Sequence, residues 1–300
     1  MKIGIVGAGA MGSIFAYFFH KADINLTFFE KNNDIIKNIG SGLNVILGDD
    51  TVNIKIDIGN NPLILKGCQI IIIFVKTYDT EDAVKEIAPE IDKTSIIVSL
   101  QNGIGSKDII AKYIHEDRIV YGSTSIGATR VNGNTVRLGG MGDVVIGGAD
   151  KEAVAIAGSV LKKAGLKVNV SVNPEEVVWK KAIINAGINP LGALLGVPNG
   201  KIIESEYGRN LQENIIREAV NVAAKIGLKL DADQMIEQTR NVCKNTSQNI
   251  CSMLQDVKAN RRTEIDSING IIIKLGKLNS IPTPYNDAVY NLIKAKELLY

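Results

Sequence analysis

The pattern of hydrophobic and polar positions divides the chain into two parts. Up to about residue 172, short apolar runs alternate with helical segments, which is typical of buried parallel strands joined by crossover helices. The predicted strands are 2–6, 26–29, 70–75, 95–100, 119–121, 135–138, 143–147 and 167–172, and the predicted helices are 13–21, 80–88 and 151–164. Beyond residue 172 only helical periodicity continues. The pattern therefore predicts an α/β domain over residues 1–172 and an all-helical domain over residues 173–300.

A glycine-rich segment follows the first predicted strand and leads into the first predicted helix. It reads Gly7-Ala8-Gly9-Ala10-Met11-Gly12 and satisfies G-x-G-x-x-G in its required setting. Gly7 would make the tight turn, Gly9 would let a pyrophosphate approach the helix N-terminus, and Gly12 would allow close helix–strand packing. The segment predicts a Rossmann-type dinucleotide-binding domain. The alternative is a glycine-rich turn in another α/β fold.

The second predicted strand ends on Glu30 and Lys31, where this fold reads the adenosine ribose. A carboxylate there binds the ribose hydroxyls of NADH, whereas a basic residue accommodates the 2′-phosphate of NADPH. The sequence alone does not decide which of the two side chains points inward. Lys76 and Asn102 follow two later strands, so they are further candidate cofactor contacts. The alternative for Asn102 is turn chemistry, because Asn-Gly is itself a turn signal, and the alternative for Lys76 is a solvated side chain.

A polar stripe lies on the first helix predicted after the boundary at Pro174. At 100° per residue, Lys181, Asn185 and Asn189 fall on one narrow face, and apolar residues surround them. An amine and two amides carried toward the interior require polar partners, and a ligand would supply them. The alternative is a core helix whose amides bond the neighbouring backbone and whose lysine reaches solvent.

A second polar stripe is predicted at Asn249, Ser252 and Asp256, spaced i, i+3 and i+7. The buried face of that helix would consist of Ile250, Met253, Leu254 and Val257. Further on, Thr263 precedes an apolar helix predicted over 268–275 and would cap it. Glu264 would then either favour the dipole of that helix or take part in a site.

Composition and charge narrow the functional classes. The chain has 300 residues, 45% of them hydrophobic and 22% charged, and a net charge of +2, which gives no electrostatic case for nucleic acid or an anionic membrane. Three cysteines and two histidines have no metal-ligand spacing. Apart from the run 3–19, which contains the glycine-rich segment, no segment approaches the ~20 apolar residues needed to span a bilayer. We therefore expect a cytoplasmic protein without a metal that acts on a small molecule. The oligomeric state is left open, with a homodimer as one option.

With these residues assembled, the chain resembles the ketopantoate reductase (2-dehydropantoate 2-reductase) family over nearly its whole length. The shared motifs are the glycine-rich segment, Gln101-Asn102-Gly103, Trp179-x-Lys181-x-x-x-Asn185-x-x-x-Asn189-Pro190, Pro198-Asn199-Gly200, Asn249-x-x-Ser252-Met253-Leu254-Gln255-Asp256 and Thr263-Glu264-Ile265-Asp266-x-x-Asn269-Gly270. The first motif is generic, but the later ones in this order are specific.

The resemblance implies reduction of 2-dehydropantoate to (R)-pantoate with NADPH, on the route to pantothenate and coenzyme A. It makes Lys181 the catalytic lysine and Glu264 the active-site acid, which is associated with both cofactor and substrate. It also implies that Asn102, Asn185, Asn189, Asn199, Asn249 and Ser252 bind substrate. Glu30 departs from the family's NADPH preference and keeps NADH dependence open.

The residue chemistry agrees with these roles, because adding hydride to a ketone builds negative charge that an ammonium can stabilise and protonate. Two alternatives remain open. One is another 2-oxoacid or hydroxyacid dehydrogenase on the same two-domain plan, and the other is a dinucleotide-binding sensor without catalysis.

Overall fold

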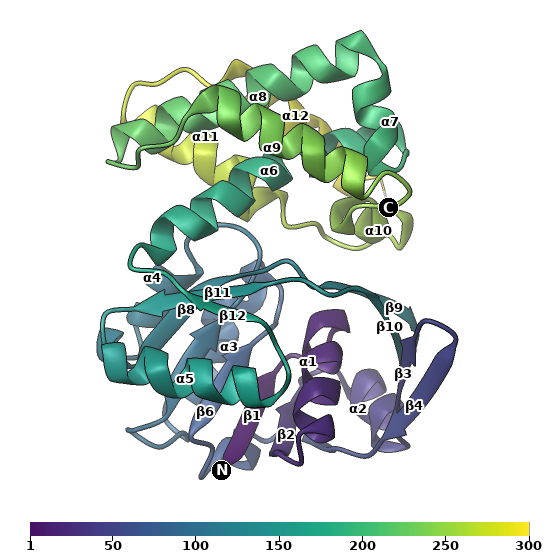
Figure 1. Ribbon diagram of the computed structural model, residues 1–300, viewed down its shortest axis with the longest axis vertical. Helices are drawn as coiled ribbons and strands as arrows, with labels where there is room; N and C mark the ends of the chain where they lie inside the picture. The colour runs from purple at the N-terminus through teal and green to yellow at the C-terminus, as the bar shows by residue number, and fades with distance from the viewer. Residues whose placement is uncertain (300) are drawn as a thin grey trace. The chain divides into compact units, whose positions relative to one another are not determined.

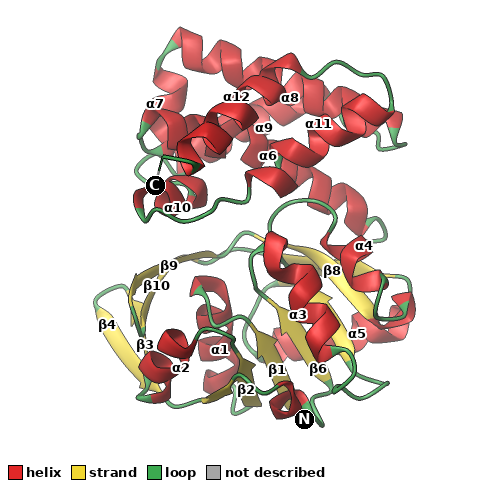
Figure 2. Ribbon diagram, turned by 180° about the vertical axis from the view of Figure 1, so that it is seen from behind, coloured by secondary structure: helices red, strands yellow, loops and turns green. Residues whose placement is uncertain are grey.

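The structure is a computed structural model that describes residues 1–299. The chain forms two compact units (Figure 1). One unit contains Met1–Gln101 and Ser106–Val177, and the other contains Asn102–Gly105 together with the chain from Val178 onward. The first unit is built on β-sheets, and the second is helical (Figure 2).

An eight-stranded sheet forms the centre of the first unit. Its order is β12-β11-β8-β7-β6-β1-β2-β5, and all neighbouring pairs are parallel except β11 with β8. Because the chain proceeds outward in both directions from β1, the sheet has its topological switch point between β1 and β6, where open α/β sheets bind ligands. The strands are β1 Lys2–Val6, β2 Asn25–Phe29, β5 Asp57–Gly59, β6 Ile70–Ile73, β7 Ile96–Ser99, β8 Ile119–Thr124, β11 Val144–Gly148 and β12 Val168–Val170.

A second, four-stranded sheet was not expected from the hydrophobic pattern. Its order is β4-β3-β10-β9, with β3 Leu43–Leu47, β4 Asp50–Ile54, β9 Gly127–Asn132 and β10 Thr135–Gly140. The strand predicted at 135–138 lies in this unit as expected, and it forms part of the second sheet as β10. Polar residues interrupt the strands β4 and β9, so they lack the apolar runs that mark the central sheet.

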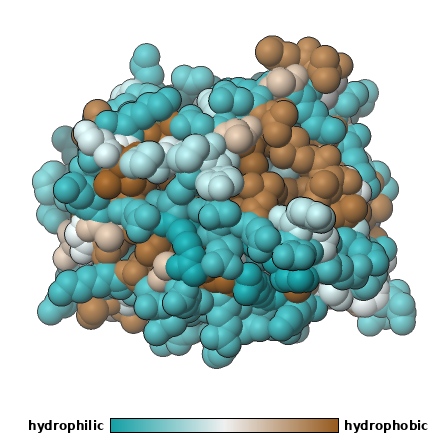
Figure 3. All heavy atoms as spheres, turned by 90° about the horizontal axis from the view of Figure 1, so that it is seen from above, coloured by the Kyte–Doolittle hydropathy of each residue, from teal (hydrophilic) through white to brown (hydrophobic). Residues whose placement is uncertain are grey.

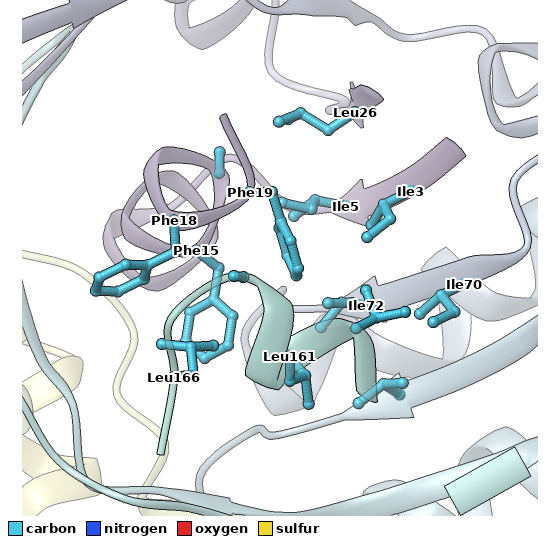
Figure 4. Packing of buried hydrophobic residues seen from close by; sticks show 14 of the residues in the cluster. Ile3, Ile5, Phe15, Phe18, Phe19, Leu26, Ile70, Ile72, Leu161 and Leu166 are labelled. Carbon is cyan, nitrogen blue, oxygen red and sulfur yellow. The ribbon is translucent and has the colours of Figure 1, made fainter. Parts of the chain in front are cut away.

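Helices cover both faces of the central sheet. They are α1 Ala10–Lys21, α2 Asn33–Gly40, α3 Thr80–Ile87, α4 Ser106–Ala111 and α5 Lys151–Lys163. Phe15 and Phe19 of α1 and Leu161 of α5 pack with Ile3, Ile5 and Ile72 on one face (Figure 4). The alternate residues Ile71 and Ile73 pack on the other face with residues of α3 and α4. Burial on both faces explains why these strands are continuous apolar runs.

The second unit packs its helices around a core that includes Trp179, Ile183 and Ile216. Its helices are α6 Pro174–Leu195, α7 Asn199–Glu204, α8 Glu206–Lys225, α9 Ala232–Asn245, α10 Ser252–Lys258, α11 Asn269–Leu278 and α12 Pro284–Glu297, although the first turn of α6 belongs to the other unit. The buried Glu218 carboxylate accepts bonds from the backbone N–H groups of Tyr285 and Asn286 at 2.9 Å each. It thereby satisfies two N-terminal donors of α12. Within residues 1–299, no helix is long and apolar enough to cross a membrane.

Candidate active site

The glycine-rich segment forms the turn between β1 and α1. Gly7 has φ +96°, and a side chain there would lie 2.8 Å from the backbone nitrogen of Val75. A side chain at Gly12 would lie 2.2 Å from the Gly7 carbonyl oxygen, whereas one at Gly9 would meet no atom within 4 Å. Gly7 and Gly12 therefore allow tight packing, and Gly9 leaves open space beside the N-terminus of α1. These residues fit a bound dinucleotide pyrophosphate.

Glu30 and Lys31 point to different partners. The Glu30 carboxylate accepts bonds from the backbone N–H groups of Ala8 at 2.8 Å and Asn32 at 2.9 Å. Lys31 instead forms an ion pair with Glu86 of α3, and about half of its side chain remains exposed. The acidic residue is thus the one directed to the glycine-rich turn.

Lys76 lies half-buried between β6 and the 3₁₀ turn Thr77–Asp79. Gln101 stabilises this segment, because its amide nitrogen donates to the Val75 carbonyl at 2.7 Å and to the Thr80 hydroxyl at 2.8 Å. The Ser99 hydroxyl donates to the amide oxygen of Gln101 at 3.0 Å. A buried and fully bonded amide therefore fixes the loop that carries Lys76.

One functional candidate, Arg130, was absent from the sequence prediction. It comes from β9 in the second sheet, and its guanidinium donates to the carbonyl oxygen of Ala8 in the glycine-rich turn. Its position 122 residues further along the chain gave no local signal of this contact.

Lys181, Asn185 and Asn189 all lie within α6, so they share one face as the spacing indicated. Lys181 and Asn185 are half-buried, and Asn189 is buried. Eight residues of helix place the two ends of the stripe about 12 Å apart along the axis. The stripe therefore connects two groups of side chains in the helical unit.

At the first end, Lys181 interacts electrostatically with the buried Glu264. Burial lowers the pKa of the Lys181 ammonium from its ordinary 10.5 to about 8, although the Glu264 carboxylate opposes this by raising the pKa. An amine with this pKa can release its proton near neutral pH. This property suits a general acid.

Asn102 lies in the segment 102–105, which packs with the helical unit. Gly103 has φ +84°, and a side chain there would lie 2.5 Å from the Ser267 hydroxyl. The backbone N–H of Ile104 donates to the Ser267 carbonyl at 2.9 Å, and the Ser267 hydroxyl donates to the Glu264 carbonyl at 3.1 Å. The segment that carries Asn102 is therefore hydrogen-bonded to the turn that follows Glu264.

At the other end of the stripe lie Asn189 and the buried Asn199. The amide nitrogen of Asn199 donates to the Thr246 hydroxyl at 2.9 Å, and that hydroxyl donates to the Val242 carbonyl. This orientation leaves the buried amide oxygen of Asn199 without a partner among residues 1–299. A buried acceptor of this kind is costly unless a donor reaches it, and a substrate hydroxyl is one such donor.

The predicted stripe holds only for Ser252 and Asp256, which lie four residues apart on α10, because this helix begins at Ser252. Cys251 caps this helix by accepting from the Leu254 N–H, so Asn249 precedes the cap, and its carbonyl accepts from the Asn199 N–H at 2.9 Å. Ile250, which was predicted to be buried, is 39% exposed, whereas Met253, Leu254 and Val257 are buried as expected.

Thr263 also differs from its predicted role. Its side chain accepts from the Ile265 N–H and donates to the Glu297 carboxylate at 2.7 Å, and α11 starts later, at Asn269. Thr263 therefore supports the 3₁₀ turn Ile265–Ser267 that follows Glu264 and does not cap α11.

Pro190 interrupts the hydrogen bonding of α6 within the stripe. A proline has no N–H, so it leaves the carbonyl of the residue four positions earlier, Ala186, without its helical donor. The amide of Asn269 lies 3.5 Å from this oxygen, and the Gln212 amide donates to the next carbonyl, that of Gly187, at 3.1 Å. Side chains from α8 and α11 therefore donate hydrogen bonds to the α6 carbonyl groups next to the proline.

Two other kinds of site, a metal centre and a reactive thiol, receive no support in the described part of the chain. Residues 1–299 contain no group of three or more His, Cys, Asp or Glu side chains that could hold a metal ion. Burial raises the pKa of Cys68 and Cys251 to about 11, which disfavours reactive thiolates. A surface groove between α8 and α9 is lined by both acidic and basic side chains that pair with one another, including Glu213 with Arg217 and Arg240.

Comparisons with known proteins identify both halves of the chain. The family model described as "Ketopantoate reductase PanE/ApbA" matches residues 3–151, and its companion, "Ketopantoate reductase PanE/ApbA C terminal", matches residues 173–297. The 2-dehydropantoate 2-reductase of Pyrococcus horikoshii is 34% identical over 304 residues, which cover 100% of this chain and 98% of that protein.

Solved structures share the fold of the whole chain. D-mandelate dehydrogenase in its ternary structure with NADH and anilino(oxo)acetate has a TM-score of 0.94 and 30% identity, covering 99% of this chain and 98% of that one. A dimeric ketopantoate reductase from Staphylococcus aureus has the same fold at 19% identity, with a TM-score of 0.85 and 99% of each chain covered. Both family models and full-length similarity therefore place this chain in the ketopantoate reductase family.

Proposed function

We propose that the protein reduces 2-dehydropantoate to (R)-pantoate with a nicotinamide dinucleotide. The observation that supports this most strongly is the amine of Lys181, whose pKa is about 8 and whose electrostatic partner is Glu264, on the helix that also carries Asn185 and Asn189. We further propose that residues 1–172 hold the dinucleotide and residues 173–300 hold the substrate, with Asn102 acting alongside the helical unit.

Each polar residue then has a defined task in ketone reduction. A nicotinamide dinucleotide held at the glycine-rich turn would supply the hydride for this reduction. Lys181 stabilises the charge that develops on the carbonyl oxygen and donates a proton to it. Glu264 keeps Lys181 protonated enough to donate near neutral pH, because its negative charge raises the pKa of the amine.

Neutral groups on α6 and at the start of α7 would orient the substrate. Asn185 and Asn189 can donate amide hydrogens to a carboxylate, and the unpartnered amide oxygen of Asn199 can accept from a hydroxyl. A substrate with a carboxylate and a hydroxyl at opposite ends suits this arrangement. Asn102, Asn249 and Ser252 would supply further contacts, and the last two are exposed.

NADH is the cofactor that the ribose-reading position favours. Glu30 presents its carboxylate at the glycine-rich turn, where it can bind ribose hydroxyls and would repel a 2′-phosphate. Lys31 is held by Glu86 and does not offset this charge at the turn. The D-mandelate dehydrogenase structure that resembles this chain also contains NADH.

Replacing Glu30 with glutamine is expected to raise the ratio of kcat/KM for NADPH over that for NADH by about tenfold, since it removes the repulsion of the 2′-phosphate. Steady-state kinetics with both nucleotides measure this ratio. Glu86→Gln should change it in the same direction but less, because Lys31 is released while Glu30 remains. An unchanged ratio in Glu30→Gln would mean that the Glu30 carboxylate does not face the ribose.

A second candidate function is reduction of other 2-oxoacids, which the similarity to D-mandelate dehydrogenase favours. The deciding experiment is oxidation of NADH and NADPH with 2-dehydropantoate and, separately, with phenylglyoxylate and simpler 2-oxoacids. Turnover confined to 2-dehydropantoate supports the proposed function. Preference for an aryl or simple 2-oxoacid contradicts it, and nucleotide binding without any turnover points to a sensor.

We also propose that the protein is a cytoplasmic homodimer. Its cysteines Cys68, Cys243 and Cys251 are free and buried, which suits a reducing compartment. The face of the molecule in Figure 3 shows a continuous apolar area, and the exposed large apolar side chains of the helical unit include Tyr207, Leu278, Leu292 and Leu298. Light scattering should give a mass about twice the 32.3 kDa of one chain, and a mass near 32.3 kDa would contradict the dimer.

A further inference from the structure

The second sheet of the nucleotide-binding unit brings an arginine to the glycine-rich turn. Arg130 lies on β9, which packs against α1. Its guanidinium donates to the carbonyl of Ala8, to the Ser13 hydroxyl at 3.3 Å and to the Gly133 carbonyl at 2.7 Å. Contacts to three separate segments fix the position of this side chain.

Both backbone polar groups of Ala8 are hydrogen-bonded to side chains. The Ala8 N–H donates to the Glu30 carboxylate at 2.8 Å, while the Ala8 carbonyl accepts from Arg130 and from the Ser13 hydroxyl. Ala8 is fully buried and lies between Gly7 and Gly9, two residues with little conformational preference of their own. The turn therefore depends on these side chains for its shape.

The chemistry of Arg130 goes beyond what packing of a sheet on a helix requires. A guanidinium brings a permanent positive charge to the turn, which an apolar side chain on β9 would not. Gly9, the open position of the same turn, is where a dinucleotide diphosphate would approach. The charge would thus lie beside the diphosphate, which NADH and NADPH have in common.

We propose that Arg130 is a cofactor-positioning residue. It holds the glycine-rich turn in its binding shape before the dinucleotide arrives, and its charge favours the diphosphate. This inference rests on the proposed dinucleotide-dependent function. Because Arg130 acts on the turn and not on the ribose, it strengthens the binding of NADH and NADPH by the same factor, in contrast to Glu30.

The test uses direct binding, measured by the fluorescence of NADH and NADPH with the full-length protein. Arg130→Met is expected to raise Kd and KM for both nucleotides about tenfold, as expected for losing a charged hydrogen bond, and to change kcat at saturation by less than about twofold. Arg130→Lys keeps the charge but not the forked geometry, so it should recover part of the affinity. The wild-type Kd should also rise more steeply with salt than that of Arg130→Met.

Arg137 provides the matched control, since it lies on β10 of the same sheet and is exposed. Arg137→Met should leave both Kd values unchanged. A lowered melting temperature in both Arg130 variants with unaltered Kd would show that Arg130 only supports folding and would overturn the proposal. A change in the ratio of NADH to NADPH affinity would also overturn it, because it would place the side chain at the ribose.

Failure of this inference and failure of the proposed function remain distinguishable. Nucleotide affinity is measured without any 2-oxoacid, so a protein that binds NADH through Arg130 but does not reduce 2-dehydropantoate would contradict only the substrate assignment. Turnover of 2-dehydropantoate with unchanged nucleotide affinity in Arg130→Met would contradict only the role of Arg130.

Discussion

Replacing Lys181 with alanine is expected to lower kcat by about 10²-fold or more while leaving the Kd for NADH within about twofold of wild type. The variant loses the group that protonates the developing alkoxide, but it leaves the glycine-rich turn of the other unit intact. Steady-state kinetics with 2-dehydropantoate and fluorescence titration with NADH measure the two effects separately.

The pH dependence of kcat/KM in the wild-type protein should report the ionisation of Lys181. A general acid works in its protonated form, and the pKa of Lys181 is about 8, so kcat/KM should be retained below pH 8 and should fall about tenfold per unit above it. In Lys181→Ala this alkaline decline should disappear from the residual activity.

Lys180 provides the control for the orientation of the stripe. It lies on the same helix and has the same chemistry, but its side chain projects about 100° away from Lys181. Lys180→Ala should change kcat by less than about threefold. Similar losses for the two variants would contradict the assignment of the polar face of α6.

Replacing Glu264 with glutamine is expected to lower kcat by about tenfold or more at pH 8 and to move the alkaline decline to lower pH. The Glu264 charge raises the pKa of Lys181, so its removal leaves the lowering by burial unopposed and less of the amine protonated. The loss should therefore be smaller at pH 6 than at pH 8, a pattern that damage to the fold alone would not produce.

Asp266 is the matched control for this charge. It lies two residues after Glu264, but its carboxylate accepts from Tyr290 at 2.9 Å and pairs with Arg262 and Lys294. Asp266→Asn should lower the melting temperature while leaving the midpoint of the alkaline decline in place. If Glu264→Gln also left that midpoint unchanged, Glu264 would have no electrostatic effect on the catalytic amine.

The features that the sequence predicted well depend on local periodicity. The central strands, the glycine-rich turn and the stripe from Lys181 to Asn189 all follow from spacings within one element, and helical geometry persists along α6 despite Pro190. Asn249 failed the same reasoning, because Cys251 caps a helix that the spacing alone had extended too far.

The features that the sequence could not predict depend on distant partners. Whether Glu30 or Lys31 faces the turn is decided by Glu86 on α3, and Arg130 reaches Ala8 from a sheet whose strands lack a strong apolar pattern. The satisfaction of the Ala186 carbonyl by Asn269 likewise joins residues 83 positions apart. Periodicity contains no information about such pairings.

Because residues 102–105 pack with the helical unit, that unit cannot be obtained as one continuous fragment of the chain. Ile104 is part of the helical core, so a fragment that starts at Val178 would lack one of its core side chains. Loss of a buried isoleucine costs about 2–5 kcal/mol, a large share of the stability of a typical domain. During synthesis, the segment 102–105 likewise cannot complete its packing until the chain has been made as far as its partner Ser267. Proteolysis between the units would therefore not release a complete helical domain.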